Sequence, residues 1–151
     1  MIKVLFICHG NICRSPMAEF VMKDLVKKAG LEREFLIESC ATHTDEIGSP
    51  VYAPARRKLA EHGLSCQGKF ARLITRQDYA KYDLLIGMDN RNLHNMHRLF
   101  DGDPDGKIRL LMDYTGQHRD VADPWYTGDF EATWQDVLSG CTALLHELSE
   151  K

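Results

Sequence analysis

The sequence predicts an α/β fold with a parallel sheet, in a single domain over residues 1–151. Short runs rich in Ile, Leu, Val and Phe alternate with segments of helical period, which is the order of elements in parallel α/β proteins. The runs are apolar at consecutive positions, as in strands covered on both faces. A chain of 151 residues with 44% hydrophobic composition can bury one good core, but it is short for two ordinary domains.

Four strands and five helices are expected along the chain. The strands are Ile2 to Ile7, Phe35 to Cys40, Asp83 to Met88 and Lys107 to Met112. The helices are Ser15 to Ala29, Ala53 to His62, Arg76 to Tyr82, Asn90 to Leu99 and Phe130 to the end. Pro16 in the first turn and Gly30 after the last turn mark the bounds of the first helix. Apolar residues recur at helical spacing from Phe130 onward, so we expect the last helix to pack on the sheet.

Charge and cysteine content limit the partners and the compartment. The formal net charge is −3, so no overall basic field exists to hold nucleic acid or an anionic membrane surface. The N-terminus does not resemble a signal peptide, and no run approaches the ~20 apolar residues that a membrane span needs. The five cysteines lack the paired spacing of zinc sites and fit a reducing compartment. We expect a cytoplasmic protein that is a monomer or associates only weakly with itself.

The segment from Cys8 to Ser15 carries the chemistry, because it lies where the first strand meets the first helix. Ligands of open α/β sheets gather at the carboxyl ends of strands, and a helix N-terminus binds anions. A cysteine, five intervening residues and an arginine can wrap a phosphate, with backbone N–H groups pointing inward and Arg14 closing the loop as a bidentate fork. The phosphate-binding residues are then His9, Gly10, Asn11, Ile12, Cys13 and Arg14.

The same positive environment favours a thiolate at Cys8, which is the form of cysteine that acts as a nucleophile. Ser15 is placed to donate a hydrogen bond to that sulfur. Gly10 suits a tight turn, and Asn11 tolerates a left-handed backbone or braces the loop through its side chain. A buried cysteine beside an unrelated surface arginine is the alternative. It is disfavoured because strand, glycine-containing loop, Arg-Ser-Pro and helix coincide.

The segment Cys8 to Glu19 is similar to the phosphate loop of the low-molecular-weight protein tyrosine phosphatases. The resemblance extends through Ser39 to Thr42, Tyr82 to Asp89 and Asp123 to Tyr126, and so covers nearly the whole chain. It implies a four-stranded parallel sheet flanked by helices on both faces. It also implies hydrolysis of phosphotyrosine in a protein or peptide through a phosphocysteine intermediate, without metal or cofactor.

The resemblance also implies the catalytic roles. Cys8 would be the nucleophile, Arg14 the phosphate clamp and Ser15 the support for the leaving thiolate. Asp123 would be the general acid that protonates the leaving phenolate and then activates water. Taken without the resemblance, Asp123-Pro124 fits a simple turn better than a catalytic position, although a loop over the site is reasonable between the fourth strand and the last helix.

Aromatic residues and a second thiol complete the predicted pocket. Trp125 and Tyr126, together with Ile12, would flank a flat phenyl ring and disfavour short phosphoserine. Packing of one of the two rings against the last helix is the alternative. Cys13 would trap an oxidised Cys8 as a reversible disulfide, unless it only packs beneath the loop. Cys40, Cys66 and Cys141 are expected to be core or bystander residues.

Two positions depart from the family pattern. Asp45 stands at about the position where many members carry a tryptophan, which predicts a more acidic pocket wall and weaker binding of acidic phosphopeptides. Lys69 begins Lys69-Phe70-Ala71-Arg72 where a histidine usually precedes Ala-Arg. We therefore expect no histidine to brace Asn11.

Three other functions are open to a loop of this kind. An arsenate reductase on the same fold relays oxidation through extra cysteines, but none occurs between Cys66 and Cys141. A phosphoarginine phosphatase would carry threonine in place of Ile12. A phosphocarrier of the sugar-transport IIB type needs no general acid, so Asp123 discriminates against it.

Overall fold

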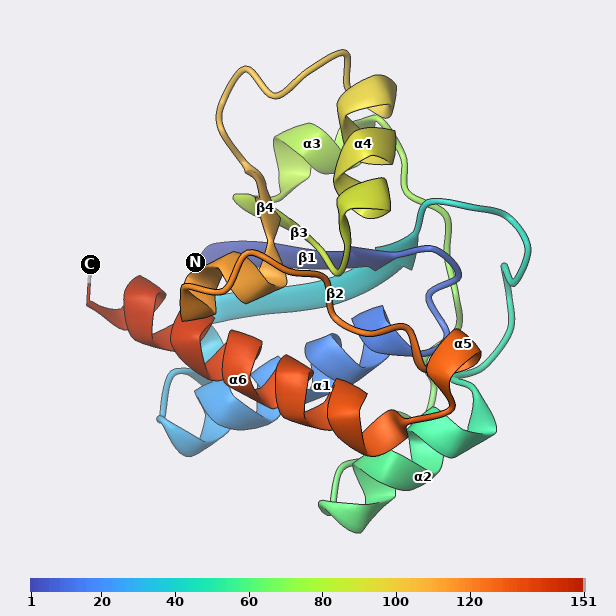
Figure 1. The fold of residues 1–151 in the computed structure, drawn as a ribbon. Coiled ribbons are helices and arrows are strands. Elements are labelled where there is room, and N and C mark those ends of the chain that lie inside the picture. Colours follow the sequence, from blue (N-terminus) through green and yellow to red (C-terminus); the bar gives the residue numbers. More distant parts are fainter. Residues whose placement is uncertain (151) are drawn as a thin grey trace.

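A computed structural model describes residues 1–150 and shows a parallel sheet between two layers of helices (Figure 1). The strands are β1 (Ile2–Cys8), β2 (Phe35–Ala41), β3 (Leu84–Gly87) and β4 (Ile108–Leu110). The α-helices are α1 (Arg14–Lys28), α2 (Ala53–Glu61), α3 (Gln77–Lys81), α4 (Asn90–Leu99), α5 (Pro124–Thr127) and α6 (Phe130–Ser149). Two 3₁₀ turns, η1 (Glu32–Glu34) and η2 (Leu111–Thr115), complete the chain. The sheet has the order β2-β1-β3-β4, and every pairing is parallel, so the predicted fold class is confirmed.

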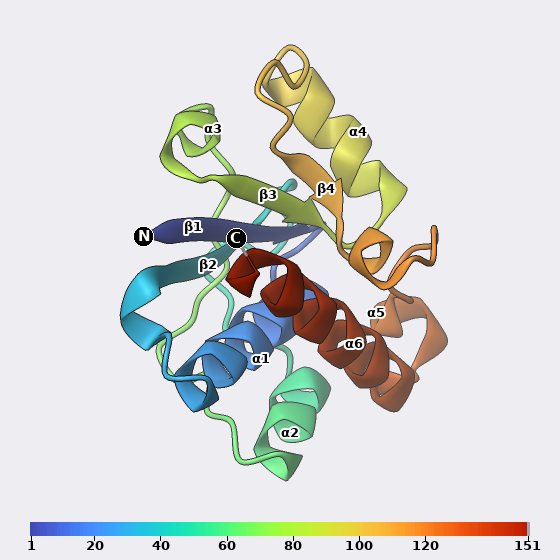
Figure 2. The same cartoon turned by 90° about the vertical axis from the view of Figure 1, so that its left-hand side faces the viewer.

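The two faces of β1 belong to two separate parts of the core. Val4 and Phe6 pack with the residues of α1 and α6, whereas Leu5 and Ile7 pack with residues of the α3 and α4 layer. All four side chains are fully buried. Figures 1 and 2 both show α1, α2 and α6 on one side of the sheet and α3 and α4 on the other. The continuous apolar run of β1 therefore follows from burial on both faces.

The fourth strand is shorter than the sequence predicts. The expected strand from Lys107 to Met112 is a strand only over Ile108–Leu110, and Leu111 and Met112 belong to η2. Both residues are buried, so their apolar character reflects packing against the helical layer rather than pairing in the sheet. Leu111 lies so close to α6 that a Cβ added to Gly140 would come 2.5 Å from its Cγ. The short helix α5 and the turn η1 were not predicted.

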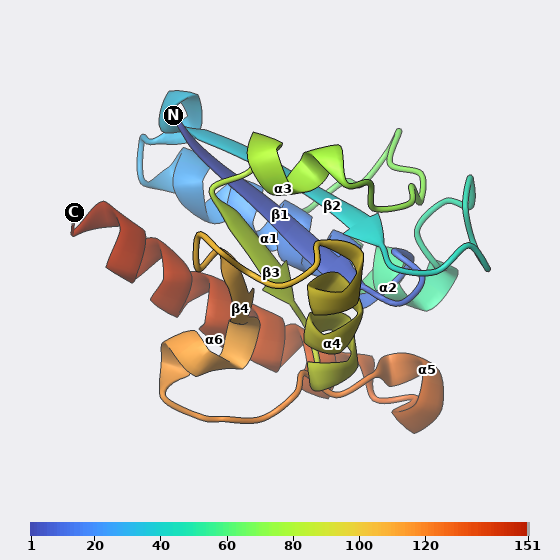
Figure 3. The ribbon, with the colours of Figure 1, turned by 90° about the horizontal axis from the view of Figure 1, so that it is seen from above.

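The carboxyl ends of the parallel strands place the site. Cys8 is the last residue of β1 and pairs with Ala41 at the end of β2, while Ile7 pairs with Gly87 at the end of β3. The view from above places α4 and α5 at this end of the sheet (Figure 3). Asp89 caps α4 there, its side chain accepting a 2.8 Å hydrogen bond from the backbone N–H of Asn92. Within residues 1–150, no helix combines the length and the apolar character that crossing a membrane requires.

Candidate active site

The segment between β1 and α1 curls around the sulfur of Cys8. The backbone N–H of Asn11 points to Cys8 Sγ at 3.3 Å, and Ser15 Oγ lies 2.9 Å from the same sulfur. Asn11 has a φ of +60°, so it adopts the left-handed backbone that the sequence analysis allowed for it, and Gly10 does not occupy a left-handed position. The contact between Ser15 and the sulfur is the one that the sequence led us to expect. Cys8 is 3% exposed, which leaves its sulfur at the bottom of a depression.

Arg14 is held in place from three directions. Its Nη2 lies 2.9 Å from Asp89 Oδ2 and 3.4 Å from Asp123 Oδ2, and its Nη1 donates to the carbonyl of Val121 at 3.1 Å. Burial opposes the charge of this side chain, but the neighbouring Cys8, Asp89 and Asp123 outweigh it and raise the pKa of Arg14. The guanidinium is therefore a fixed cation beside Cys8, and contacts within the protein alone set its orientation.

Asp89 is a site residue to which the sequence analysis gave no role. It was noticed only as the end of a segment that resembles the family, although it follows β3 directly at the carboxyl edge of the sheet. Gly87 lets α4 begin close to that edge, because a Cβ there would come 2.9 Å from the Cβ of Asn92. Asp89, the N-cap residue of α4, is thereby placed in contact with Arg14. A polar residue at the end of the strand next to β1 was the signal that pointed to it.

Asp123 both begins a helix and faces the cavity. Its Oδ1 accepts a 3.0 Å hydrogen bond from the backbone N–H of Trp125, and Pro124 occupies the first turn of α5. Its Oδ2 is the atom near Arg14, and its side chain is 28% exposed. The turn and the loop over the site are therefore not alternatives, since the Asp-Pro turn itself carries the carboxylate to the site. Cys8, Arg14 and Asp123 come together from the first and last quarters of the chain.

Beneath the loop, the side chain of Asn11 makes three hydrogen bonds. Its Nδ2 donates to Ser15 Oγ at 2.8 Å and to Ser39 Oγ at 2.9 Å, and its Oδ1 accepts from the backbone N–H of Arg72 at 3.2 Å. Ser39 in turn donates to Glu19 Oε1 at 2.5 Å. Because Ser15 already accepts from Asn11, its own hydroxyl hydrogen is left to point at the sulfur of Cys8.

Lys69 supports this set of hydrogen bonds from its far end. Its Nζ donates to the carbonyl of Ser39 at 2.7 Å and lies 3.2 Å from Glu19 Oε1. Lys23 binds the other carboxylate oxygen at 2.6 Å. Glu19 is 4% exposed, so these two ammonium groups compensate a buried charge. Sequence reasoning noted that Lys69 stands where a histidine is usual, but it did not predict that the lysine would reach Ser39 and Glu19.

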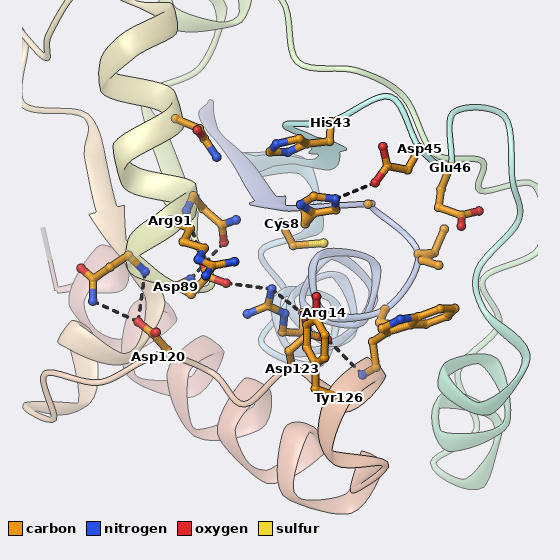
Figure 4. A pocket seen from close by; sticks show the side chains of 18 of the residues that line it. Cys8, Arg14, His43, Asp45, Glu46, Asp89, Arg91, Asp120, Asp123 and Tyr126 are labelled. Atoms are coloured by element: carbon orange, nitrogen blue, oxygen red, sulfur yellow. Dashed lines mark hydrogen bonds and ion pairs between the residues drawn. The ribbon is translucent and has the colours of Figure 1, made fainter.

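The loop opens into a cavity of about 1060 Å³ (Figure 4). The expected pocket residues Ile12, Asp45, Trp125 and Tyr126 line it, together with Glu46 and with Arg91 and His94 of α4. Trp125 is 56% and Tyr126 82% exposed, so neither ring is buried against α6. Trp125 instead contacts Tyr52, with ring centroids 5.0 Å apart.

At the mouth of the cavity, where His9 and Asp45 are exposed, the carboxylate of Asp45 is paired with the imidazole of His9. Asp45 Oδ2 lies 2.9 Å from His9 Nε2, and this hydrogen bond lowers the pKa of Asp45. His9 also stacks on His43, with ring centroids 4.0 Å apart and planes 15° from parallel. The more acidic wall that the sequence predicted is therefore bordered by two histidines.

The five thiols are all free and buried. Burial, followed by the proximity of Cys8, raises the pKa of Cys13 to about 12. Burial also raises the pKa of Cys40, Cys66 and Cys141, which lie outside the cavity, as expected of core residues. Each of these four thiols is therefore protonated at neutral pH.

Comparisons with known proteins agree with this geometry. A sequence model described as low molecular weight phosphotyrosine protein phosphatase matches residues 3–151. The low molecular weight protein-tyrosine-phosphatase YfkJ of Bacillus subtilis is 37% identical, over 100% of this chain and 98% of that protein. The low molecular weight phosphotyrosine protein phosphatase of Rattus norvegicus is 38% identical, over 95% of this chain and 94% of that protein.

Solved structures give the same result. The crystal structure of YfkJ superposes with a TM-score of 0.96 at 38% identity, over 99% of this chain and 96% of that one. A Drosophila arginine phosphatase superposes with a TM-score of 0.88 at 32% identity, over 97% of this chain and 98% of that one. Sequence and structure together show that the chain belongs to the low molecular weight phosphotyrosine protein phosphatase family.

Proposed function

We propose that this hydrolase removes phosphate from phosphotyrosine and small aryl phosphates, with Cys8 as nucleophile, Arg14 as phosphate clamp and Asp123 as general acid. The observation that carries the proposal is the meeting of these three side chains at one cavity, with the sulfur at its bottom. The phosphate would lie in the loop of residues 9–14, where Asn11 already directs a backbone N–H toward the sulfur.

In the first step, Cys8 Sγ attacks phosphorus while the bond to the phenolic oxygen breaks. Asp123, protonated, gives its proton to that oxygen, so a phenol leaves. Arg14 and the backbone N–H groups of the loop hold the equatorial oxygens, where charge is spread in the transition state. Asp89 and the Val121 carbonyl keep the guanidinium oriented throughout.

In the second step, a water molecule attacks the phosphorus of the phosphocysteine and the S–P bond breaks. Asp123 now accepts the proton of the water, and inorganic phosphate is formed. Ser15 stabilises the departing thiolate through its hydroxyl, which Asn11 leaves free to point at Cys8. Ser15, Asn11 and the loop backbone thus stabilise the Cys8 thiolate, which is the leaving group of this step, rather than bind the substrate.

The depth and lining of the cavity support an aryl substrate. Cys8 is nearly inaccessible from the surface, so the reacting phosphate must enter at the end of a long and narrow group. Ile12, Trp125 and Tyr126 offer apolar and aromatic contact to a phenyl ring. The shorter side chain of phosphoserine would bring its backbone against these residues before the phosphate reached the sulfur.

We also propose the setting of the reaction. The partner would be a protein or peptide that contains phosphotyrosine, and the enzyme would act in the cytoplasm as a monomer or a weakly self-associating molecule, without nucleic acid, membrane, metal or cofactor. If a peroxide oxidised Cys8 to the sulfenic acid, the Cys13 thiol would attack its sulfur, forming the disulfide and releasing water. Because burial and the nearby Cys8 raise the pKa of Cys13 to about 12, this capture would be slow at neutral pH and would become faster as pH rises.

Steady-state hydrolysis of para-nitrophenyl phosphate tests the proposal, in reducing buffer with a chelator, for the wild type and for Cys8→Ser. We expect turnover in the wild type and none in the variant. Phosphate retained on Cys8 without turnover would indicate a phosphocarrier instead. A preference for phosphoarginine over phosphotyrosine in the same assay would move this chain to the activity named for its Drosophila neighbour.

A further inference from the structure

A second hollow of about 290 Å³ adjoins the active-site cavity. Pro50, Val51 and Tyr52, from the segment that leads into α2, form its apolar lining, and the charged Arg56 also borders it. Ile12, Glu46 and Trp125 line both this hollow and the active-site cavity. A ligand that leaves the cavity past Ile12 and Trp125 therefore meets the hollow next.

The hollow is tied to the phosphate loop by the backbone. The N–H of Tyr52 donates to the carbonyl of Ile12 at 2.9 Å, so the Pro50 to Tyr52 segment is fixed relative to the loop that would hold the phosphate. Val51 is 2% exposed, and Arg56 donates from its Nη1 to the Val51 carbonyl at 3.4 Å. The floor is thus built from anchored residues rather than from a free loop.

Apolar surface is left uncovered around this hollow. Tyr52 is 37% and Trp125 56% exposed, and the two rings contact each other at its border. Exposed aromatic surface next to a catalytic cavity is typical of a binding site. Glu46 and Arg56 carry opposite charges, so their sum gives the hollow no preference for one sign of ligand charge.

We propose that this hollow is a subsite for an apolar side chain of the substrate, within two residues of the phosphotyrosine. The inference rests on the proposed phosphotyrosine activity, and its argument is the continuity of the hollow with the cavity that accepts the phosphotyrosine ring. Neighbouring side chains of an extended peptide point to opposite sides, and their backbone positions are about 3.3 Å apart, so a residue one or two positions away can reach an adjoining hollow. The main cavity selects the phosphorylated ring, and the hollow selects the sequence around it.

The test uses peptides in which one residue near the phosphotyrosine is varied at a time, at each of the two positions before it and the two positions after it. At each position the peptides carry leucine, serine, aspartate or lysine. We expect kcat/KM for leucine to exceed that for serine by about five- to tenfold at one of these positions, as for a modest apolar contact in a pocket. Para-nitrophenyl phosphate does not extend to the hollow. Its turnover therefore reports on the catalytic site alone.

Two variants change the hollow without touching catalytic residues. Tyr52→Ala removes an aromatic side and should abolish the leucine preference. Ala53→Asp places a carboxylate in the hollow at the first turn of α2, where a negative charge is favourable for the helix. We expect this variant to exchange the preference for leucine for a preference for lysine. Neither variant should change the turnover of para-nitrophenyl phosphate by more than about twofold.

Two controls accompany them. Leu73→Ala removes a side chain of similar exposure, 38%, outside both hollows, and should keep the leucine preference. Arg56→Gln should keep it too and alter only the ranking of aspartate and lysine. Equal rates for all wild-type peptides, or an unchanged leucine preference in both Tyr52→Ala and Ala53→Asp, would overturn the subsite. Loss of para-nitrophenyl phosphate turnover in the wild type would instead overturn the proposed function.

Discussion

The underside of the phosphate loop and the mouth of its cavity are built in opposite ways. Beneath the loop, Asn11, Ser15, Ser39 and Glu19 are at most 4% exposed, and each is hydrogen-bonded to another member of the set. At the mouth, the side chains of His9 and Asp45 are 52% and 63% exposed. Buried polar groups are costly unless they are paired, so the underside has one stable arrangement, whereas the mouth can vary at little cost. The buried residues beneath the loop would thus determine the catalytic geometry, and the exposed residues at the cavity entrance would determine which substrates bind.

The largest effect is expected from Arg14→Lys, which keeps a positive charge at the cavity but removes the planar guanidinium with its paired N–H donors. An ammonium cannot contact Asp89, the Val121 carbonyl and a phosphate in the geometry of a guanidinium. We expect kcat for para-nitrophenyl phosphate to fall by about a thousandfold, as for other arginines that stabilise phosphoryl transfer. An unchanged kcat would show that positive charge alone suffices.

Asp123→Ala should come next, because it removes the proton donor but not the phosphate loop. We expect kcat to fall by about a hundredfold or more for phenyl phosphate. The loss should be smaller for para-nitrophenyl phosphate, whose leaving group needs a proton less. Inhibition by inorganic phosphate should be nearly unchanged. Equal losses for both esters, or a lost affinity for phosphate, would contradict the role of Asp123 as acid.

Lys69→Met and Lys23→Met form a matched pair on the underside. Each removes one ammonium from Glu19, but only Lys69 also binds the Ser39 carbonyl. Lys69 is also the better buried of the two, with 13% of its side chain exposed against 45% for Lys23. We expect Lys69→Met to lower the free energy of unfolding by about 1–3 kcal/mol, and Lys23→Met by less.

A second readout separates a positioning role of Lys69 from a merely stabilising one. If Lys69 orients Ser39, Asn11 and Ser15, its loss should move the pH profile of Cys8 alkylation by iodoacetamide to higher pH. Lys69→Arg should restore much of the wild-type profile. Identical profiles for wild type, Lys69→Met and Lys23→Met would show that the lysine supports only the fold.

Asp45→Asn should have the smallest effect, since the pair with His9 is exposed and screened by solvent. We expect turnover of para-nitrophenyl phosphate to stay within about twofold of wild type. KM for acidic phosphopeptides should fall by a similar factor, and the difference should shrink at high salt. A large loss with the small ester would mean that the mouth takes part in the chemistry.

Much of this division could be predicted from the sequence. The spacing of apolar residues predicted the sheet and the main helices. The short motif from Cys8 to Arg14 predicted the position of the loop. Asp123 was identified through its family resemblance, because a turn carboxylate looks the same whether or not it faces a cavity. Glu19, Asp89 and the contacts of Lys69 were missed because they depend on which strands and helices come together. η2 was missed because Leu111 and Met112 are apolar for burial, not for pairing.

The five thiols differ in their expected reactivity toward alkylating reagents, so alkylation can report on the folding of the protein. Four of the five cysteines are buried thiols whose pKa is raised. Under native conditions, a neutral alkylating reagent should modify Cys8 alone, whereas the unfolded chain should take up five groups. Counting the groups by mass spectrometry would then reveal two quantities in one sample: occupancy of the loop, from protection of Cys8, and the unfolded fraction, from the fully labelled chain.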